Sequence, residues 1–365
     1  AGINHMLQSA RAEAARTQVL LPGIAVIAMK QMERCDGGVT VIDFDPLALV
    51  LRSVGRMNPP PENAPPTTNA HAQPSVVFNQ LPGKPFYVAA AAQLDRLRDS
   101  GHFQDLLQAP DEKAAPPWLK QTSALQFAAY PSPAGLAGGL LNDSLLILES
   151  AQSEALLNQI RAAVLAANPN TGPVKREATW EDNQQVKDAG SANLYSITIV
   201  DAPPEFAQAR MFEQLLYGRL GWRGFVKDMN SAVAVTFSQR PAVLQSAIAV
   251  ANDPTKSLES SATLRTMRQW MPAQRDVELY LGLGQLAQIV SQAVETFGMN
   301  ADEMVTIDPG APPVGFALNA DRNTIESSLI IPAPICAAAF DQFMKQALQP
   351  AEEPAPHIKP SGGAP

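Results

Sequence analysis

Two stretches of the chain decide its fold: DSLLILESAQSEALLNQIRAAVLAANP at residues 143–169 and NSAVAVTFSQRPAVLQSAIAVANDP at residues 230–254. Each begins with Asp or Asn, continues as a short apolar strand, passes a Ser/Gln corner and enters a helix with one apolar face. Aligning Ser144 with Ser231 also aligns four further identical pairs: Gln152/Gln239, Ala155/Ala242, Leu157/Leu244 and Ala162/Ala249. We interpret the two stretches as copies of one strand–helix unit.

The side chains within each stretch support this interpretation. LLIL at residues 145–148 is apolar without alternation, as expected for a strand that is covered on both faces. Ser153 stands where a helix N-cap is expected. Residues 233–237 alternate between apolar and smaller side chains, and Pro241 occupies a first-turn position, where a helix tolerates the missing N–H.

The same order of strand and helix recurs along the chain. At residues 38–57, Asp45 and Pro46 predict the cap and first turn of a helix over 47–54. The other segments with this order are 192–216, 276–297 and 314–348, the last with a hairpin over ADRN and a helix that Pro334 opens. One unit cannot bury its own apolar helix face, so neighbouring units must pack together.

The sequence therefore predicts an α+β fold of two related halves, built from repeated strand–helix units on mainly antiparallel sheets. The first half spans 1–169 and contains a proline-rich loop at 57–74. Residues 170–189 are predicted to be a linker or an exposed hairpin, and the second half spans 190–348. Residues 349–365 have the composition of a disordered, proline-rich tail.

Composition limits the classes of function. The net charge is −8, with 35 acidic and 27 basic residues, so the footprint of a nucleic-acid partner is missing. The apolar run at 19–29 is too short to span a bilayer, and we expect a buried strand there and no transmembrane segment in the mature chain. Cys35 and Cys336 lie far apart in sequence; a free buried thiol at Cys336 and a disulfide between the two both remain open.

No motif for catalysis, metal or cofactor binding is evident. The four histidines, His5, His71, His102 and His357, form no HxH, HExxH or Cys/His cluster. Asp43 and Asp45 would share one face of a strand end and, with His102, are the residues that an enzyme hypothesis could name. We expect no catalytic residue, no metal site and no cofactor.

An aromatic and basic patch at residues 215–230, LLYGRLGWRGFVKDMN, is the strongest candidate for a binding site. Its predicted partner-binding residues are Tyr217, Arg219, Trp222, Arg223, Phe225 and Lys227. Aromatic and arginine side chains are enriched at protein–protein contacts. The alternative is a helix that ends at Gly218 or Gly221 and folds its aromatic side chains back as a hydrophobic stop.

Three segments, VTVIDFDPLALVL, ELYLGLGQLAQIV and PPVGFALNADRNTIESSLIIP, together resemble bacterial, planctomycete-like extracytoplasmic proteins of unknown function. The resemblance implies duplicated strand–helix modules and a location in the periplasm or cell envelope. It supplies no catalytic residues.

From these observations we expect a non-catalytic, extracytoplasmic binding or structural protein that acts through a protein partner or through self-association. A carrier of an apolar ligand held between sheets and Ala-rich helices is the alternative, and an enzyme is the third hypothesis.

Overall fold

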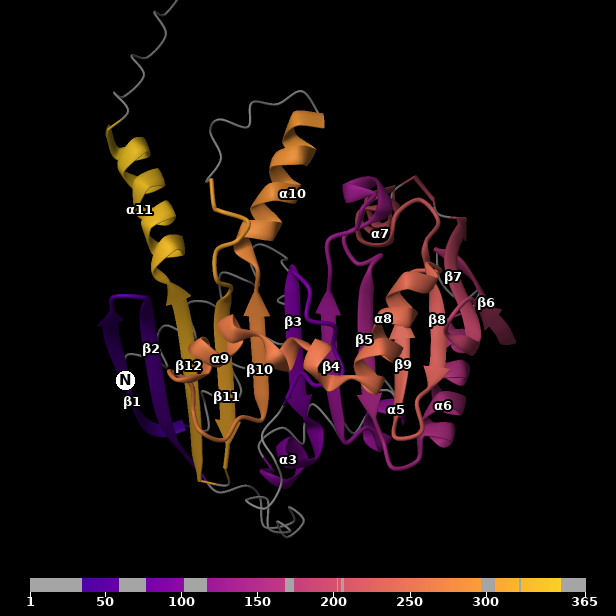
Figure 1. The fold of residues 1–365 in the computed structure, drawn as a ribbon, viewed down its shortest axis with the longest axis horizontal. Helices are drawn as coiled ribbons and strands as arrows, with labels where there is room; N and C mark the ends of the chain where they lie inside the picture. The colour runs from indigo at the N-terminus through magenta and orange to yellow at the C-terminus, as the bar shows by residue number, and fades with distance from the viewer. Residues whose placement is uncertain are drawn as a thin grey trace, which may run out of the picture.

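The computed structural model describes residues 35–58, 77–101, 117–167, 174–201, 203–204, 207–296, 306–321 and 323–348. These residues form one sheet of twelve strands in the order β1-β2-β12-β11-β10-β3-β4-β5-β9-β8-β7-β6 (Figure 1). Neighbouring strands are antiparallel throughout, from β1 with β2 at one edge to β6 with β7 at the other. The predicted α+β class with antiparallel pairing is confirmed.

The strands are β1 (Cys35–Asp45), β2 (Ala48–Met57), β3 (Val88–Gln93), β4 (Ala124–Ala129), β5 (Ser144–Glu149), β6 (Lys175–Val186), β7 (Gly190–Asp201), β8 (Trp222–Asp228), β9 (Ala232–Thr236), β10 (Val277–Leu281), β11 (Val314–Ala320) and β12 (Thr324–Pro332). The α-helices are α3 (Leu94–Asp99), α5 (Pro117–Gln121), α6 (Ser153–Ala166), α7 (Ala207–Tyr217), α8 (Pro241–Asn252), α9 (Ala262–Arg268), α10 (Leu283–Thr296) and α11 (Ala333–Leu348). Short 3₁₀ turns are η2 (Gly135–Gly138), η4 (Pro254–Lys256) and η5 (Leu258–Ser260).

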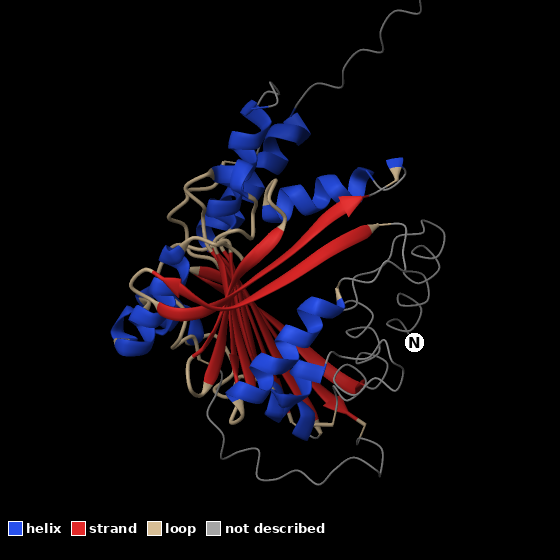
Figure 2. Cartoon of the chain, turned by 90° about the vertical axis from the view of Figure 1, so that its right-hand side faces the viewer, coloured by secondary structure: helices blue, strands red, loops and turns tan. Residues whose placement is uncertain are grey.

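Helices cover both faces of the sheet, which Figure 2 shows edge-on. Leu145 and Ile147 of β5 face one side, in the same core cluster as Leu244 of α8 and Leu264 of α9. Leu148, the next residue of the strand, belongs to the cluster of α6 on the opposite side. The unbroken apolar run of β5 is thus explained, as predicted, by burial on both faces.

The prediction of two related halves is not confirmed. Both quoted stretches do form a strand followed by a helix, β5–α6 and β9–α8, but α6 and α8 pack against opposite faces of the sheet. Three sections of the chain instead share one element order, in which a helix follows the first and the third strand of an antiparallel three-stranded meander. These meanders are β3–β4–β5, β7–β8–β9 and β10–β11–β12.

The predicted helix at residues 47–54 is wrong, because this segment is strand β2. Asp45 does form a tight turn, since its Oδ1 accepts a hydrogen bond of 2.9 Å from the Leu47 amide. Such an Asx turn can begin a helix or join two strands. Here β2 pairs with β1 on one side and with β12 on the other, and this pairing outweighs the local helix signal.

The other strand–helix predictions are confirmed in type and approximate position, although Ser153, the predicted N-cap, is the first residue of α6 and Gln152 stands at the cap. Pro241 is the first residue of α8, β10 leads directly into α10, and the β11–β12 hairpin is followed by α11, in which Pro334 is the second residue. Cys336 is a half-buried free thiol, so it is not in a disulfide. The apolar run at 19–29, most of the loop at 57–74, and the tail at 349–365 lie outside the described residues.

Candidate functional site

A groove of about 1290 Å³ lies where η2, the end of α7, the start of β8 and the segment before α8 meet. Its described lining contains three arginines, Arg219, Arg223 and Arg240, and no aspartate or glutamate. The chain as a whole carries a net charge of −8. The groove is therefore a cationic surface on an acidic protein.

Exposed apolar side chains stand beside the arginines. Met211 and Leu215 of α7 and Leu220 of the following loop line the groove, and they are 69%, 44% and 59% exposed. Side-chain amides, among them Gln214 and Gln239, complete this part of the lining. The groove thus combines positive charge, apolar area and hydrogen-bonding groups, as protein-binding surfaces do.

Two glycines allow the two loops that build the groove to touch. A Cβ atom on Gly139 would lie 2.3 Å from the Gly218 nitrogen, and both glycines have positive φ, +90° and +75°. The loop that contains Gly139 also contacts the end of α7, where the Leu140 amide donates to the Leu215 carbonyl at 3.0 Å. These contacts satisfy carbonyls that a helix C-terminus otherwise leaves without a partner.

The three arginines have different environments. The Nη1 of Arg240, just before α8, donates to Asp143 Oδ2 at 2.6 Å. The Asp143 side chain is 8% exposed, and its Oδ1 accepts no hydrogen bond from the described residues. Among the described residues, the side chains of Arg219 and Arg223 have no ion-pair or hydrogen-bond partner. Burial lowers the pKa of half-buried Arg223.

A stack of aromatic rings lies next to the groove, and Tyr217 belongs to both. Tyr217 stacks on Trp222 with ring centroids 5.6 Å apart, and Trp222 stacks on Phe237 at 5.9 Å. Trp222 Nε1 donates to the Tyr195 hydroxyl at 2.7 Å, and that hydroxyl donates to the Thr236 carbonyl at 2.8 Å. The rings therefore fix the end of α7 on the sheet.

The structure separates the six residues of the sequence-predicted patch. Tyr217, Arg219 and Arg223 line the groove, whereas Trp222 lies half-buried in the aromatic stack. Two members lie elsewhere: Phe225 is buried in the core beneath α8 and α9, and Lys227, further along β8, donates to the Ser191 carbonyl at 2.7 Å.

Sequence reasoning missed Arg240 and Met211, because only the β8–β9 pairing and the packing of α7 bring these two residues close to Arg223. The one sequence signal near Arg240, the SQRP corner, indicates only a helix start.

Loss of a packed aromatic side chain and loss of a charged side chain should affect the stability of the protein differently in this site. We expect Trp222→Ala to lower the free energy of unfolding by about 2–4 kcal/mol, because a stacked, hydrogen-bonded indole is removed. Arg223→Gln should not lower it, because the guanidinium has no partner to lose among the described residues and a partly buried cation is removed. Urea denaturation of both variants measures this. Equal losses would show that Arg223 also belongs to the packed interior.

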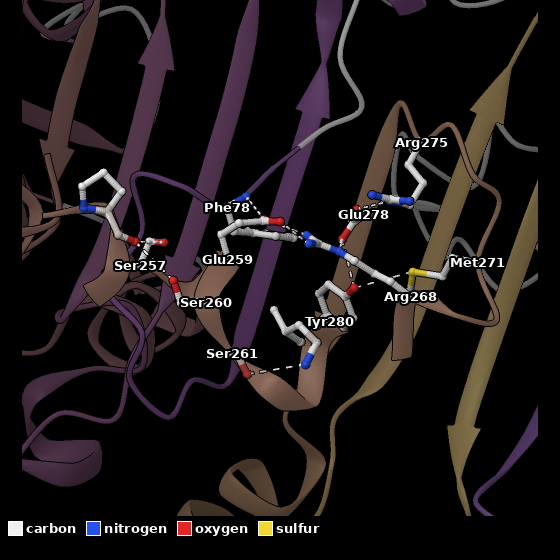
Figure 3. A network of polar contacts seen from close by, with 12 residues as sticks. Phe78, Ser257, Glu259, Ser260, Ser261, Arg268, Met271, Arg275, Glu278 and Tyr280 are labelled. Carbon is white, nitrogen blue, oxygen red and sulfur yellow. Dashed lines mark hydrogen bonds and ion pairs between the residues drawn. The ribbon is translucent and has the colours of Figure 1, made fainter. Parts of the chain in front are cut away.

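A second cluster of charged side chains is buried between α9 and β10 (Figure 3). Glu278 is 0% exposed and accepts hydrogen bonds from Arg268 Nε at 3.0 Å, from Arg275 Nε and from the Tyr280 hydroxyl at 2.9 Å. Arg268 also forms a two-bond contact with Glu259. Burial alone would raise the pKa of Glu259, but the hydrogen bonds from Arg268 and from the backbone lower it below its ordinary value.

This cluster holds separate segments together. The Phe78 amide donates to Glu259 at 2.9 Å, which ties the segment before β3 to η5, while Arg268 connects η5 and α9 to β10. Arg268 additionally lies over the Phe78 ring, 5.8 Å from its centroid. Because every charge in the cluster has a partner and Glu278 is inaccessible, we interpret it as a structural network.

Of the residues that the enzyme hypothesis named, Asp43 and Asp45 lie within the described part of the chain. Asp43 is exposed on β1, Asp45 makes the turn into β2, and His102 lies outside the described residues, as do the other three histidines. Within the described part of the chain, no three His, Cys, Asp or Glu side chains are placed to share a metal ion. None of the described helices is long and apolar enough to cross a bilayer.

Comparison of the chain with protein families, curated proteins and solved structures finds no match.

Proposed function

We propose that the protein is a non-catalytic binding protein that holds a partner protein in the arginine-lined groove. The observation that carries this proposal is Arg223. Arg223 is half-buried in a groove whose described lining has no carboxylate, and its side chain has no partner within the described residues. Burying a cation without a counter-charge costs free energy, and a ligand that supplies the counter-charge recovers it.

The size and lining of the groove favour a protein segment over a small molecule. Its volume of about 1290 Å³ exceeds the ~300–1,000 Å³ that is usual for small-molecule pockets. Met211 and Leu220 are more than half exposed at its rim, and a partner that covers them gains hydrophobic free energy. Tyr217, supported by its stack on Trp222, offers a rigid aromatic contact of the kind that dominates protein interfaces.

A location outside the cytoplasm remains part of this proposal through the family resemblance, and fractionation of the source cells tests it. The carrier hypothesis also stays a prediction; lipid released by denaturing the purified protein would support it.

Site-specific photocrosslinking tests the proposed function. A photoreactive phenylalanine analogue at position 220 is expected to give one defined adduct in the source cells, because Leu220 is 59% exposed and lines the groove. The matched control is position 54, where Val54 is 49% exposed on β2, away from the groove. Adducts of equal yield at both positions, or none at 220, would contradict a binding site in the groove.

A further inference from the structure

We infer that the groove binds an acidic, extended segment of the partner protein, whose carboxylates pair with Arg223 and Arg219 and whose apolar side chains cover Leu215 and Leu220. This inference rests on the proposed function and specifies the chemistry of the partner. It is carried by the charge of the described lining, which has three guanidinium groups and no carboxylate, in a chain of net charge −8.

A carboxylate is the counter-ion that suits these arginines. The guanidinium group is planar and presents paired N–H donors that match the two oxygens of a carboxylate. Arg223 is already partly removed from water in the free protein, and burial lowers its pKa. Binding a carboxylate at Arg223 therefore adds an ion pair after part of the desolvation of the arginine has already occurred in folding.

The apolar lining selects a peptide over other polyanions. Met211, Leu215 and Leu220 are exposed next to the arginines, and a chain with alternating acidic and apolar side chains satisfies both kinds of surface. A nucleic acid needs a longer basic stripe than the three arginines of this lining supply. We therefore assign the groove to a protein segment, and nucleic acid becomes an outcome of the test.

Asp143 competes with a ligand carboxylate for Arg240, the third arginine of the groove. It binds Arg240 at 2.6 Å and is nearly buried, so Arg240 reaches a ligand carboxylate only in competition with Asp143. Neutralising this carboxylate leaves the positive charge of Arg240 available to the ligand. The geometry thus predicts opposite effects for two neighbouring substitutions: Arg223→Gln weakens binding and Asp143→Asn strengthens it.

Selection of random twelve-residue peptides on the immobilised full-length protein tests the inference. We expect the selected peptides to be enriched in Asp and Glu, interspersed with apolar residues. Fluorescence anisotropy of a selected peptide should give a Kd that rises about 10- to 100-fold in Arg223→Gln, since a charge-assisted hydrogen-bond pair is lost. In Asp143→Asn the Kd should fall about threefold to tenfold.

The matched control is Arg265→Gln, which removes an exposed arginine of α9 outside the groove and should change the Kd by less than about twofold. Circular dichroism of each variant confirms that it is folded. Selected peptides that are basic or uncharged, or a single-stranded oligonucleotide that displaces them with higher affinity, would overturn the inference. If those ligands still crosslink at position 220, the proposed function stands; if no ligand crosslinks there, it fails as well.

Discussion

Glu278→Gln is expected to lower the free energy of unfolding by about 3–5 kcal/mol, the largest loss that we predict for a single side chain. Glu278 is fully buried and is the acceptor for both Arg268 and Arg275. The glutamine keeps the shape but removes the charge, and an NH2 donor replaces one of the two oxygens that accept from Arg268 and Arg275. Breaking a buried ion pair from one side costs this much because the other charge stays buried.

Urea denaturation followed by circular dichroism measures the loss. Glu177→Gln is the matched control, because Glu177 is exposed on β6, and we expect it to change stability by less than about 0.5 kcal/mol. If both variants unfold at the same urea concentration as the parent protein, the network in Figure 3 does not hold α9 on the sheet.

Gly139→Ala is expected to destabilise the protein by about 2–5 kcal/mol and to displace α7. The φ of Gly139 is +90°, and its Cβ would lie 2.3 Å from the Gly218 backbone nitrogen. The left-handed backbone conformation costs an L-residue ~1–2 kcal/mol, and overpacking adds ~1–3 kcal/mol. Because backbone atoms form the clash, a change of side-chain rotamer cannot relieve it.

Gly37→Ala is a suitable control, since a Cβ at Gly37 meets no atom within 4 Å. Thermal unfolding of the two variants compares their stability. Wild-type stability of Gly139→Ala would contradict the close contact between the two loops that build the groove.

Where two local signals agreed, the sequence was enough to predict the element. At β9–α8, an alternating strand and Pro241 at a first-turn position pointed to the same boundary, and the structure has the helix beginning there. At β5, the unbroken apolar run indicated cover on both faces, which α6 and α8 provide.

The sequence was insufficient where distant strands decide the outcome. Residues 47–54 have an apolar spacing compatible with a helix, but they gain hydrogen bonds along both edges by pairing with β1 and β12, and β12 begins only at Thr324. Residues 143–169 and 230–254 share a local order of strand and helix, which suggested two related halves. That local order does not reveal which face of the sheet each helix covers.

The site shows the same limit. Tyr217, Arg219 and Arg223 are close in sequence and were predicted together, whereas Arg240 joins them only because β8 pairs with β9. Phe225 also belonged to the predicted patch, but it is buried. It lies three residues after Trp222 on β8 and therefore faces the opposite side of the sheet. Composition identifies aromatic and basic residues, but strand alternation and tertiary cover determine which of them reach the surface.

Hydrogen–deuterium exchange of the protein with and without a selected acidic peptide tests the central claim most directly. We predict slower exchange in residues 214–223 and 238–241, the segments that carry the three arginines, and unchanged exchange in β1 and β2, where Val39, Ile42 and Phe44 are also exposed. Protection of β1 and β2 without protection of 214–223 would place the binding surface at the sheet edge and contradict a binding site in the groove.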